Sequence, residues 1–434
     1  NMVAFILPAN SATGGYEIDN SFRFDDGAST FLQRTNGANT GEDNATLSFW
    51  FKLGNIKTAN NGGTIFCEGN TSGDHVMQLY AQKIYIGSEN FNLMYPNLIR
   101  DPSAWYHLFV AFDSTQGTAA NRVKPYLNGV LLENPTTFTT YPDQNENLNI
   151  TKNGTTTRIG GRGNSGDESF DGYLAEFHYL DGTTKAYTDF GEFNDNGVWI
   201  PKKYTDGSYG DNGFFLEFKQ TGGNADASGL GADTSGEGHH FSGDSVNAAE
   251  DITTDTPTNN FCTMNPLISF AGASDGIDAF TEGNTVVDSN NDTSAAGATF
   301  GVQNGKWYYE AKLATGNQSS TNFSTGWCQV DYEGQKGTGN GVGFMSGEDN
   351  ASTDVGGNII WNNSGNGNQA TFGNRSTNDI FQVALDLDNH KMWFGVNGTW
   401  SNGSSSQSTT FNANSPDFSS IFDTAGVYYM PAFA

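Results

Sequence analysis

Two stretches built on the same plan decide the fold. WYHLFVAFD (residues 105–113) leads to VKPYLNG (123–129), and FQVALDLD (381–388) leads to KMWFGVNG (391–398). Each pair has an aromatic and β-branched strand that ends at an Asp, and then a second strand closed by Asn-Gly. Asn-Gly tolerates the positive φ angles that tight hairpins need, so both pairs predict antiparallel sheet. The plan occurs once in each half, which predicts an all-β chain of two antiparallel β-sandwich (jelly-roll) domains.

Composition agrees with this fold and excludes several functions. The chain has 434 residues, enough for two domains with separate cores, and it lacks the Leu-, Ala-, Glu- and Lys-rich runs of helical proteins. The net charge of −28 disfavours nucleic acid, because phosphates need a Lys/Arg stripe and none is present. No window has the apolar length of a membrane span, so we expect no membrane insertion.

The three cysteines predict no disulfide framework. Cys67, Cys262 and Cys328 form an odd set without a Cys-x-x-Cys pair. One disulfide is an alternative, but three buried thiols are the favoured prediction.

Changes in composition along the chain suggest four regions. Residues 1–21 form an N-terminal arm, and residues 22–220 carry strands at the spacing of a sandwich. Residues 221–258 are rich in Gly, Ser, Asp and Asn and poor in large apolar side chains, which predicts a linker or an excursion along the surface. Residues 259–434 form the second sandwich, from which we expect a last strand to be missing.

The first sandwich resembles the concanavalin A-like, laminin-G-type jelly roll. The resemblance rests on LSFWF (47–51), on Trp105-Tyr106-His107 leading to Asn128-Gly129, and on FDGYLAEF (170–177). The second sandwich is similar to SPRY domains in GKWYYE (305–310), VALDLD (383–388) and WFGVNG (393–398).

Three further segments narrow the resemblance. RDPSAWYH (100–107), VWIPKKY (198–204) and DTPTNNFC (255–262) are similar to segments of large virion appendage or tail-fibre-like proteins encoded by marine bacteriophages. The resemblance implies a non-enzymatic virion protein, displayed on capsid or tail, made in the host cytoplasm and located on the virion surface. Its implied partners are other virion proteins and a host-surface glycan or protein. A purely structural capsid decoration or cement protein and a bacterial surface adhesin are the alternatives.

Catalytic patterns were sought because the jelly roll also carries glucanases. Their E-x-D-x-x-E strand places its carboxylates on one face. The nearest match, Glu17-Ile18-Asp19-Asn20-Ser21-Phe22, has Phe where the acid/base residue must stand. Asp386 and Asp388 stand two residues apart at a strand end, where a structural role is favoured over general acid/base work. We therefore expect no enzyme and no required cofactor.

Two kinds of binding site remain as candidates. A sugar ring can stack on an exposed Trp flanked by Asn and Gly loops, which points to Trp361 with Asn362 and Asn363, and to Trp400. Trp307 and Trp393 lie in strands and are expected in the core. The laminin-G-type resemblance also implies a Ca²⁺ site at a loop edge, and Asp25, Asp26 and Asp171 are the acids nearest its motifs.

The arm suggests self-assembly. Phe5, Ile6 and Leu7 have no apolar partner within it. They are expected to form either an edge strand in the chain's own fold or an anchor inserted into a neighbouring subunit. The second alternative predicts a homo-oligomer, with a trimer favoured, joined through the arm.

Overall fold

The computed structural model describes residues 15–38, 43–56, 63–69, 75–148, 150–162, 169–270, 279–288, 295–314, 324–329, 341–346, 360–362, 365–366, 377–401, 407–414 and 428–433. The chain divides into two compact units. The first lobe contains the described residues up to Phe261 together with Thr281–Gly283, and the second lobe contains Cys262–Phe280 and the residues from Asn284 onward.

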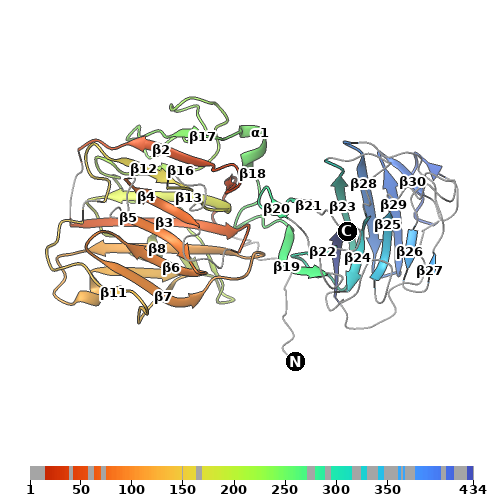
Figure 1. The fold of residues 1–434 in the computed structure, drawn as a ribbon, viewed down its shortest axis with the longest axis horizontal. Coiled ribbons are helices and arrows are strands. Elements are labelled where there is room, and N and C mark those ends of the chain that lie inside the picture. Colours follow the sequence, from red (N-terminus) through yellow and green to blue (C-terminus); the bar gives the residue numbers. More distant parts are fainter. Residues whose placement is uncertain are drawn as a thin grey trace. The chain divides into compact units, whose positions relative to one another are not determined.

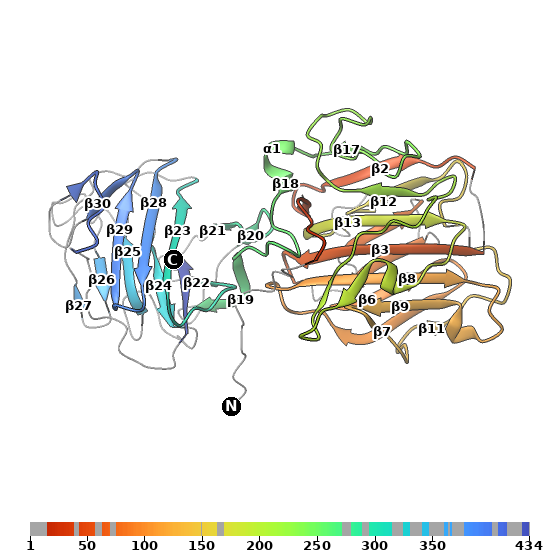
Figure 2. The same cartoon turned by 180° about the vertical axis from the view of Figure 1, so that it is seen from behind.

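The first lobe consists of two eight-stranded sheets (Figures 1 and 2). One sheet has the order β10-β9-β8-β3-β13-β1-β18, with β16 also paired to β13. The other has the order β11-β7-β6-β5-β4-β12-β2-β17. In the first sheet the strands are β1 (Ser21–Phe24), β3 (Asn44–Leu53), β8 (Trp105–Asp113), β9 (Val123–Leu127), β10 (Val130–Leu131), β13 (Gly172–Asp181), β16 (Phe214–Leu216) and β18 (Ile252–Thr253). In the second they are β2 (Phe31–Thr35), β4 (Thr64–Glu68), β5 (His75–Tyr80), β6 (Lys83–Gly87), β7 (Asn92–Leu98), β11 (Thr139–Thr140), β12 (Thr156–Ile159) and β17 (Ser242–Asp244).

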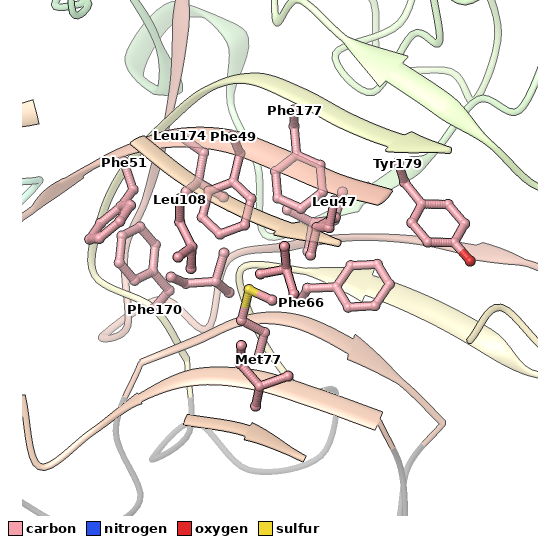
Figure 3. Packing of buried hydrophobic residues seen from close by; sticks show 14 of the residues in the cluster. Leu47, Phe49, Phe51, Phe66, Met77, Leu108, Phe170, Leu174, Phe177 and Tyr179 are labelled. Atoms are coloured by element: carbon pink, nitrogen blue, oxygen red, sulfur yellow. The ribbon is translucent and has the colours of Figure 1, made fainter. Parts of the chain in front are cut away.

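The core of this lobe follows from period-two alternation along the strands. Leu47, Phe49 and Phe51 of β3 point between the sheets, where the rings of Phe49 and Phe177 stack with centroids 4.8 Å apart (Figure 3). Short elements complete the lobe: the hairpin of β14 (Gly191–Phe193) and β15 (Trp199–Pro201), the 3₁₀ turns η1 (Ala119–Asn121) and η3 (Tyr187–Asp189), and the helix α1 (Ala248–Asp251).

The second lobe has a seven-stranded sheet and a five-stranded sheet. The larger contains, in spatial order, β19 (Met264–Phe270), β22 (Ala295–Ala298), β32 (Tyr429–Phe433), β24 (Ser324–Gln329), β25 (Gly341–Ser346), β26 (Ile360–Asn362) and β27 (Gly365–Asn366). The smaller contains β23 (Lys306–Lys312), β28 (Ile380–Asp386), β29 (Lys391–Val396), β30 (Thr399–Ser401) and β31 (Gln407–Ser408). The strands β20 (Ala279–Thr281) and β21 (Val286–Asp288) pair as a separate ribbon.

The two sheets of this lobe share a core. Phe381, Val383 and Phe394 of the smaller sheet cluster with Trp327 and Tyr429 of the larger one. The prediction of an all-β chain with two antiparallel sandwiches is therefore confirmed. The final strand, β32, lies between β22 and β24, where it pairs with both.

The Asn-Gly pairs form the predicted hairpins, and in each lobe they join two antiparallel strands. Asn128 and Gly129 (φ 49° and 74°) join β9 to β10, and Asn397 and Gly398 (φ 49° and 77°) join β29 to β30. The side chain of each Asn also accepts a hydrogen bond from the neighbouring strand. The Oδ1 atoms of Asn128 and Asn397 accept the backbone N–H of His107 (2.7 Å) and Ile380 (2.9 Å), respectively.

Of the two alternatives for residues 221–258, a linker and an excursion along the surface, the structure contradicts the linker, because the segment packs on the first lobe. Leu230 and Phe241 are buried in the first-lobe core, and the segment adds β17 to the edge of β2 and β18 to the edge of β1. A few apolar side chains are enough to hold this segment in place, because they pack into a core that other strands already form. It also brings Asp255 to Lys52, whose Nζ lies 2.8 Å from the Asp255 carboxylate in a fully buried ion pair.

The prediction for the cysteines needs a correction. Cys67 and Cys328 are buried, as predicted. Cys262 is exposed, so the prediction of three buried thiols is wrong for this residue. Within the described residues, no helix is long and apolar enough to cross a membrane.

Candidate functional site: an aromatic face on the second lobe

The outer face of the five-stranded sheet presents aromatic and polar side chains to solvent. Along β23 the residues alternate, so Tyr309 and Ala311 contact the core while Tyr308 and Glu310 project outward. The antiparallel register aligns Tyr308 with Ala384 and Trp393 in one row across the sheet. A second row contains Glu310, Gln382, Gly395 and Trp400.

Four rings form a continuous series on this face. Ring centroids lie 6.4 Å apart for Tyr308 and Trp400, 4.9 Å for Trp400 and Phe411, and 5.3 Å for Phe411 and Trp393. Tyr308 is 52% exposed, Phe411 is 43% exposed and Trp400 is half-buried. Gly395 lets the indole of Trp400 lie close to the sheet, since a Cβ there would come within 3.1 Å of that ring.

Hydrogen-bonding groups lie beside the rings. The Gln382 amide Nε2 donates to the Tyr308 hydroxyl (2.8 Å) and to Glu310 Oε1 (3.2 Å), and the Tyr308 hydroxyl donates to the same carboxylate oxygen. The Gln382 Oε1 accepts the N–H of Gly398 (2.7 Å), which fixes the amide orientation. Burial, and then the hydrogen bond to Glu310, raises the pKa of Tyr308, so the phenol stays protonated.

This arrangement has the chemistry of a sugar platform. Exposed rings offer apolar faces to the C–H surface of a pyranose, and an adjacent carboxylate and amide offer partners to its hydroxyls. We call Tyr308, Glu310, Gln382, Trp400 and Phe411 the aromatic face.

The predicted sugar-site residues divide among different places. Trp400 lies in the aromatic face. Trp361 and Asn362 belong to β26, where the backbone of Trp361 pairs with Phe344 and Asn366, and their side chains fall outside the described parts. Asn363 also lies outside the described residues. The structure therefore places one of the two predicted tryptophans in a candidate site.

The core assignments of two other tryptophans need revision. Trp307 is 37% exposed at the sheet margin, where its Nε1 donates to the Asn304 carbonyl (2.7 Å), so the prediction of a core position is wrong. Trp393 is buried as predicted, at 4% exposure, but it projects from the outer face. Phe411 covers it, and its Nε1 donates to the Asn412 carbonyl (3.1 Å).

Sequence reasoning missed Tyr308, Glu310, Gln382 and Phe411. Alternation in Lys306–Lys312 could have indicated that Tyr308 and Glu310 share a face. Their meeting with Gln382 depends on register between strands about seventy residues apart, which the sequence pattern does not specify.

The three candidate calcium ligands lie near one end of the β1–β13 pair. Register pairs Phe24 with Gly172, so Asp25 and Asp171 flank the same position. However, the Asp25 carboxylate accepts the N–H of Gly27 (2.8 Å), and Asp171 is 4% exposed. The backbone carbonyl of Asp26 accepts the N–H of Ser29 (3.2 Å) in a turn. In the part of the chain that the structure describes, no group of three His, Cys, Asp or Glu could hold a metal. These residues do not assemble a calcium ligand set, and calcium binding stays a prediction.

The glucanase-like segment does not form a catalytic strand. Glu17 and Asp19 are exposed on an extended piece before β1, Ile18 between them is buried, and Phe22 lies in the core. The two acids at the second-lobe strand end have structural roles, as predicted. Asp386 accepts from the backbone N–H (3.0 Å) and side-chain amide (2.9 Å) of Asn389, and Asp388 accepts from the N–H of Gly305 (2.8 Å).

A Ser–His pair on the outer face of the first lobe has the composition of an activated nucleophile but not its proton arrangement. The Ser48 Oγ lies 2.8 Å from His107 Nε2, and the indole N–H of Trp199 lies 3.0 Å from His107 Nδ1. An indole can only donate, so Nδ1 must accept and the ring proton of neutral His107 resides on Nε2. That proton is donated to Ser48. Burial also lowers the pKa of His107 to about 3, so this histidine cannot act as a base toward the serine.

A buried carboxylate beside this pair is also held structurally. Glu176 sits at a β-bulge in β13 with φ 49° and is 7% exposed. It accepts from the Tyr16 hydroxyl (2.9 Å) and lies 3.4 Å from His178 Nε2. The hairpin β14–β15 and its neighbours cover this face, so the group has no open cleft around it.

Comparison with known proteins agrees with the two lobes. A model of the concanavalin A-like lectin/glucanases superfamily, of laminin G type, matches residues 26–186, and a SPRY domain model matches residues 306–420. No curated protein sequence matches the chain.

Solved structures with related folds include three from different organisms. A Bacteroides ovatus protein proposed to bind carbohydrate is 13% identical over 55% of this chain and 60% of that one, with a TM-score of 0.38. The heptameric SAP-like pentraxin of Limulus polyphemus is 17% identical over 39% of this chain and 78% of its own (TM-score 0.29). The SPRY domain of human HERC1 is 12% identical over 39% of this chain and 87% of its own, with a TM-score of 0.25. On the two family models, the chain contains a region similar to concanavalin A-like lectin domains of laminin G type, followed by a region similar to SPRY domains.

Proposed function

We propose that this chain is a non-enzymatic virion appendage protein of a phage that binds glycans on the host surface through the aromatic face. The observation that carries the glycan assignment is the series of half-exposed rings at Tyr308, Trp400 and Phe411, with Glu310 and Gln382 beside them. The virion assignment rests on residues 100–107, 198–204 and 255–262, which resemble segments of phage appendage proteins.

The shape of the site sets the expected mode of binding. The aromatic face is an outer sheet surface, so it buries only part of a sugar ring and each site should bind weakly. Several copies acting together on one particle would supply the avidity that adsorption needs. A homo-oligomer, with a trimer favoured, fits this mode.

The absence of catalysis is part of the proposal. The carboxylates described above are engaged in structural hydrogen bonds or stand apart from any cleft, so none is paired across a substrate position. Incubation with host polysaccharide should therefore release no reducing ends. Turnover that is lost on mutation of a single acid would overturn the proposal.

The decisive experiment compares variants at matched exposure. Trp400→Ala and Phe411→Ala should each reduce binding to host-derived glycans, measured on a glycan array and by adsorption of particles to cells. Phe193→Ala removes a ring of similar exposure (51%) from the first lobe and should leave binding unchanged. Equal binding by all three variants would exclude the aromatic face as the site.

A parallel measurement separates adhesion from decoration. Particles that lack the protein should adsorb poorly and remain intact if the chain is an adhesin. Loss of particle stability with unchanged adsorption would favour a capsid decoration instead. Antibodies against the chain should label purified particles, and failure to do so would refute the virion location.

A further inference from the structure

A cavity of about 320 Å³ lies on the outer side of the first lobe, where β8 and β9 meet residues 184–187. Its size falls at the lower end of the roughly 300–1,000 Å³ range of small-molecule sites. The register pairs Phe109 with Tyr126 and Ala111 with Lys124, so these four side chains project from one face and form its base. The small Ala111 leaves the space beside Lys124 open.

Hydrogen bonds hold both walls in place. On one side, the Arg122 guanidinium donates to the carbonyls of Gln116 (2.9 Å) and Pro142 (2.7 Å), which anchors the loop that follows β8. On the other side, the Thr184 hydroxyl donates to the Phe112 carbonyl (2.7 Å), and the Lys185 N–H donates to the Thr46 hydroxyl (2.9 Å). A ligand would therefore enter a largely formed site and would lose little of its binding energy to ordering the loops.

Lys124 gives the cavity a positive charge with which an anion can pair. Asp113, which also lines the cavity, is ionised, because burial alone would raise its pKa but hydrogen bonds from Thr115 and Gln116 outweigh burial and lower that pKa; those two donors occupy its carboxylate oxygens. The Lys185 ammonium pairs with Asp206 at 2.7 Å. Lys124 is half-buried and enters none of the ion pairs formed by the described residues. In a chain of net charge −28, this places a lysine that forms no ion pair with the described residues at the base of a cavity.

The aromatic residues offer edges and not faces. The rings of Tyr126 and Tyr187 stack with centroids 4.3 Å apart. Their neighbours on the other sides are Phe109 (5.9 Å) and Trp199 (5.6 Å). A ligand therefore meets phenol edges, together with the amides of Gln116 and Asn121, rather than a stacking platform. Such a lining suits a molecule with many hydroxyl groups.

We infer that this cavity binds a short saccharide bearing a carboxylate, of the uronic-acid type, with Lys124 opposite the carboxylate. The lining amides and the Thr184 and tyrosine oxygens lie where sugar hydroxyls need partners. This site is in the other lobe from the aromatic face, and it recognises its ligand by charge and hydrogen bonds instead of stacking.

The test uses digalacturonate and its neutral counterpart galactobiose, titrated into the full chain by calorimetry. Digalacturonate should bind, with an affinity that falls as salt rises, and galactobiose should bind at least about tenfold more weakly. Lys124→Gln should weaken digalacturonate binding about tenfold, whereas Lys203→Gln, the same change at an exposed lysine outside the cavity, should have no effect. Ala186→Trp, a change at an exposed position on the rim, should block binding.

Three results would overturn the inference: no binding of digalacturonate by the folded chain, equal binding of galactobiose, or equal effects of the two lysine variants. The test of this cavity and the test of the aromatic face are independent, so one can fail while the other succeeds. Trp400→Ala should leave digalacturonate binding intact, and Lys124→Gln should leave binding at the aromatic face intact.

Discussion

Removing the Asp255 carboxylate should destabilise the first lobe strongly, because that carboxylate ties the 221–261 segment to the sheet. It lies 2.8 Å from the Lys52 Nζ, accepts the indole N–H of Trp105 (3.0 Å) and accepts the N–H of Phe261 (3.1 Å). The side chains of Lys52 and Asp255 are 0% and 2% exposed.

The expected magnitude follows from these contacts. Removing one partner of a buried ion pair costs roughly 3–5 kcal/mol. Lys52 keeps two neutral acceptors, Asn260 Oδ1 (2.9 Å) and the Phe261 carbonyl (2.8 Å), which moderates the loss. The stranded N–H groups of Trp105 and Phe261 then add about 1–3 kcal/mol each if water cannot reach them. Asp255→Ala should therefore lower the free energy of unfolding by at least about 4 kcal/mol. For a lobe of this size that corresponds to a fall of roughly 8–16 °C in its transition temperature.

Differential scanning calorimetry of the full chain can measure this effect, since the transition of the first lobe should fall while that of the second stays in place. Asp19→Ala is the matched control. Asp19 approaches Lys219 at 4.0 Å, but the two side chains are 72% and 60% exposed, and an exposed pair contributes little. A double change that replaces Lys52 and Asp255 by apolar residues should recover part of the loss. If Asp255→Ala costs no more than Asp19→Ala, the ion pair does not hold the segment.

Three further results are expected. Burial lowers the pKa of His107 to about 3 from 6.5, so an unfolded chain takes up a proton that the native state refuses and stability falls as pH drops below 6.5. At pH 5 the loss should be about 2 kcal/mol, and unfolding titrations of His107→Gln should lack this component. Trp393→Ala should cost about 3–5 kcal/mol in the second lobe, because Phe411 and the sheet enclose the indole; a cost under 1 kcal/mol would show that they do not. Light scattering should find an oligomer, most simply a trimer, and deletion of residues 1–15 should release folded monomers; a full chain that stays monomeric at high concentration would contradict the arm's role.

Local patterns predicted most of the fold, because most of the strands can be recognised from the alternation and turn residues of a short stretch of sequence. The Asn-Gly turns at 128–129 and 397–398 determine their hairpins by backbone geometry alone. The segment 221–258 shows the limit of the method. Its composition predicts too little apolar surface for a core of its own, which is correct, yet Leu230 and Phe241 enter a core built by strands far away in sequence. Composition describes what a segment can form alone and does not describe which existing surface it can cover.

The candidate site was less predictable for a related reason. The sequence predicted Trp400 as a sugar-binding residue because it follows an Asn-Gly turn. In the structure, its place in the aromatic face depends on Gly395 beneath its ring and Phe411 beside it. Those contacts depend on strand register and on the path of the chain after β31. The error at Trp307 has the same origin. Its place in β23 suggested burial, but its side chain lies at the sheet margin with no strand beyond it.

The two lobes use similar hairpins but differ in what covers the outer face of the hairpin sheet. In the first lobe, residues of the β14–β15 hairpin and its flanks bury Trp50, Trp105 and His107, so aromatic side chains that could have met a ligand serve as a second core. A cavity lies at the side of this face, beside Ala111 and Lys124, where recognition of a ligand would rely on charge and hydrogen bonds. In the second lobe, Phe411 covers Trp393 and leaves Tyr308 largely exposed. That face can therefore offer a ligand a stacking surface. On the two proposals made above, the second lobe would recognise its sugar by stacking and the first lobe by charge and hydrogen bonds.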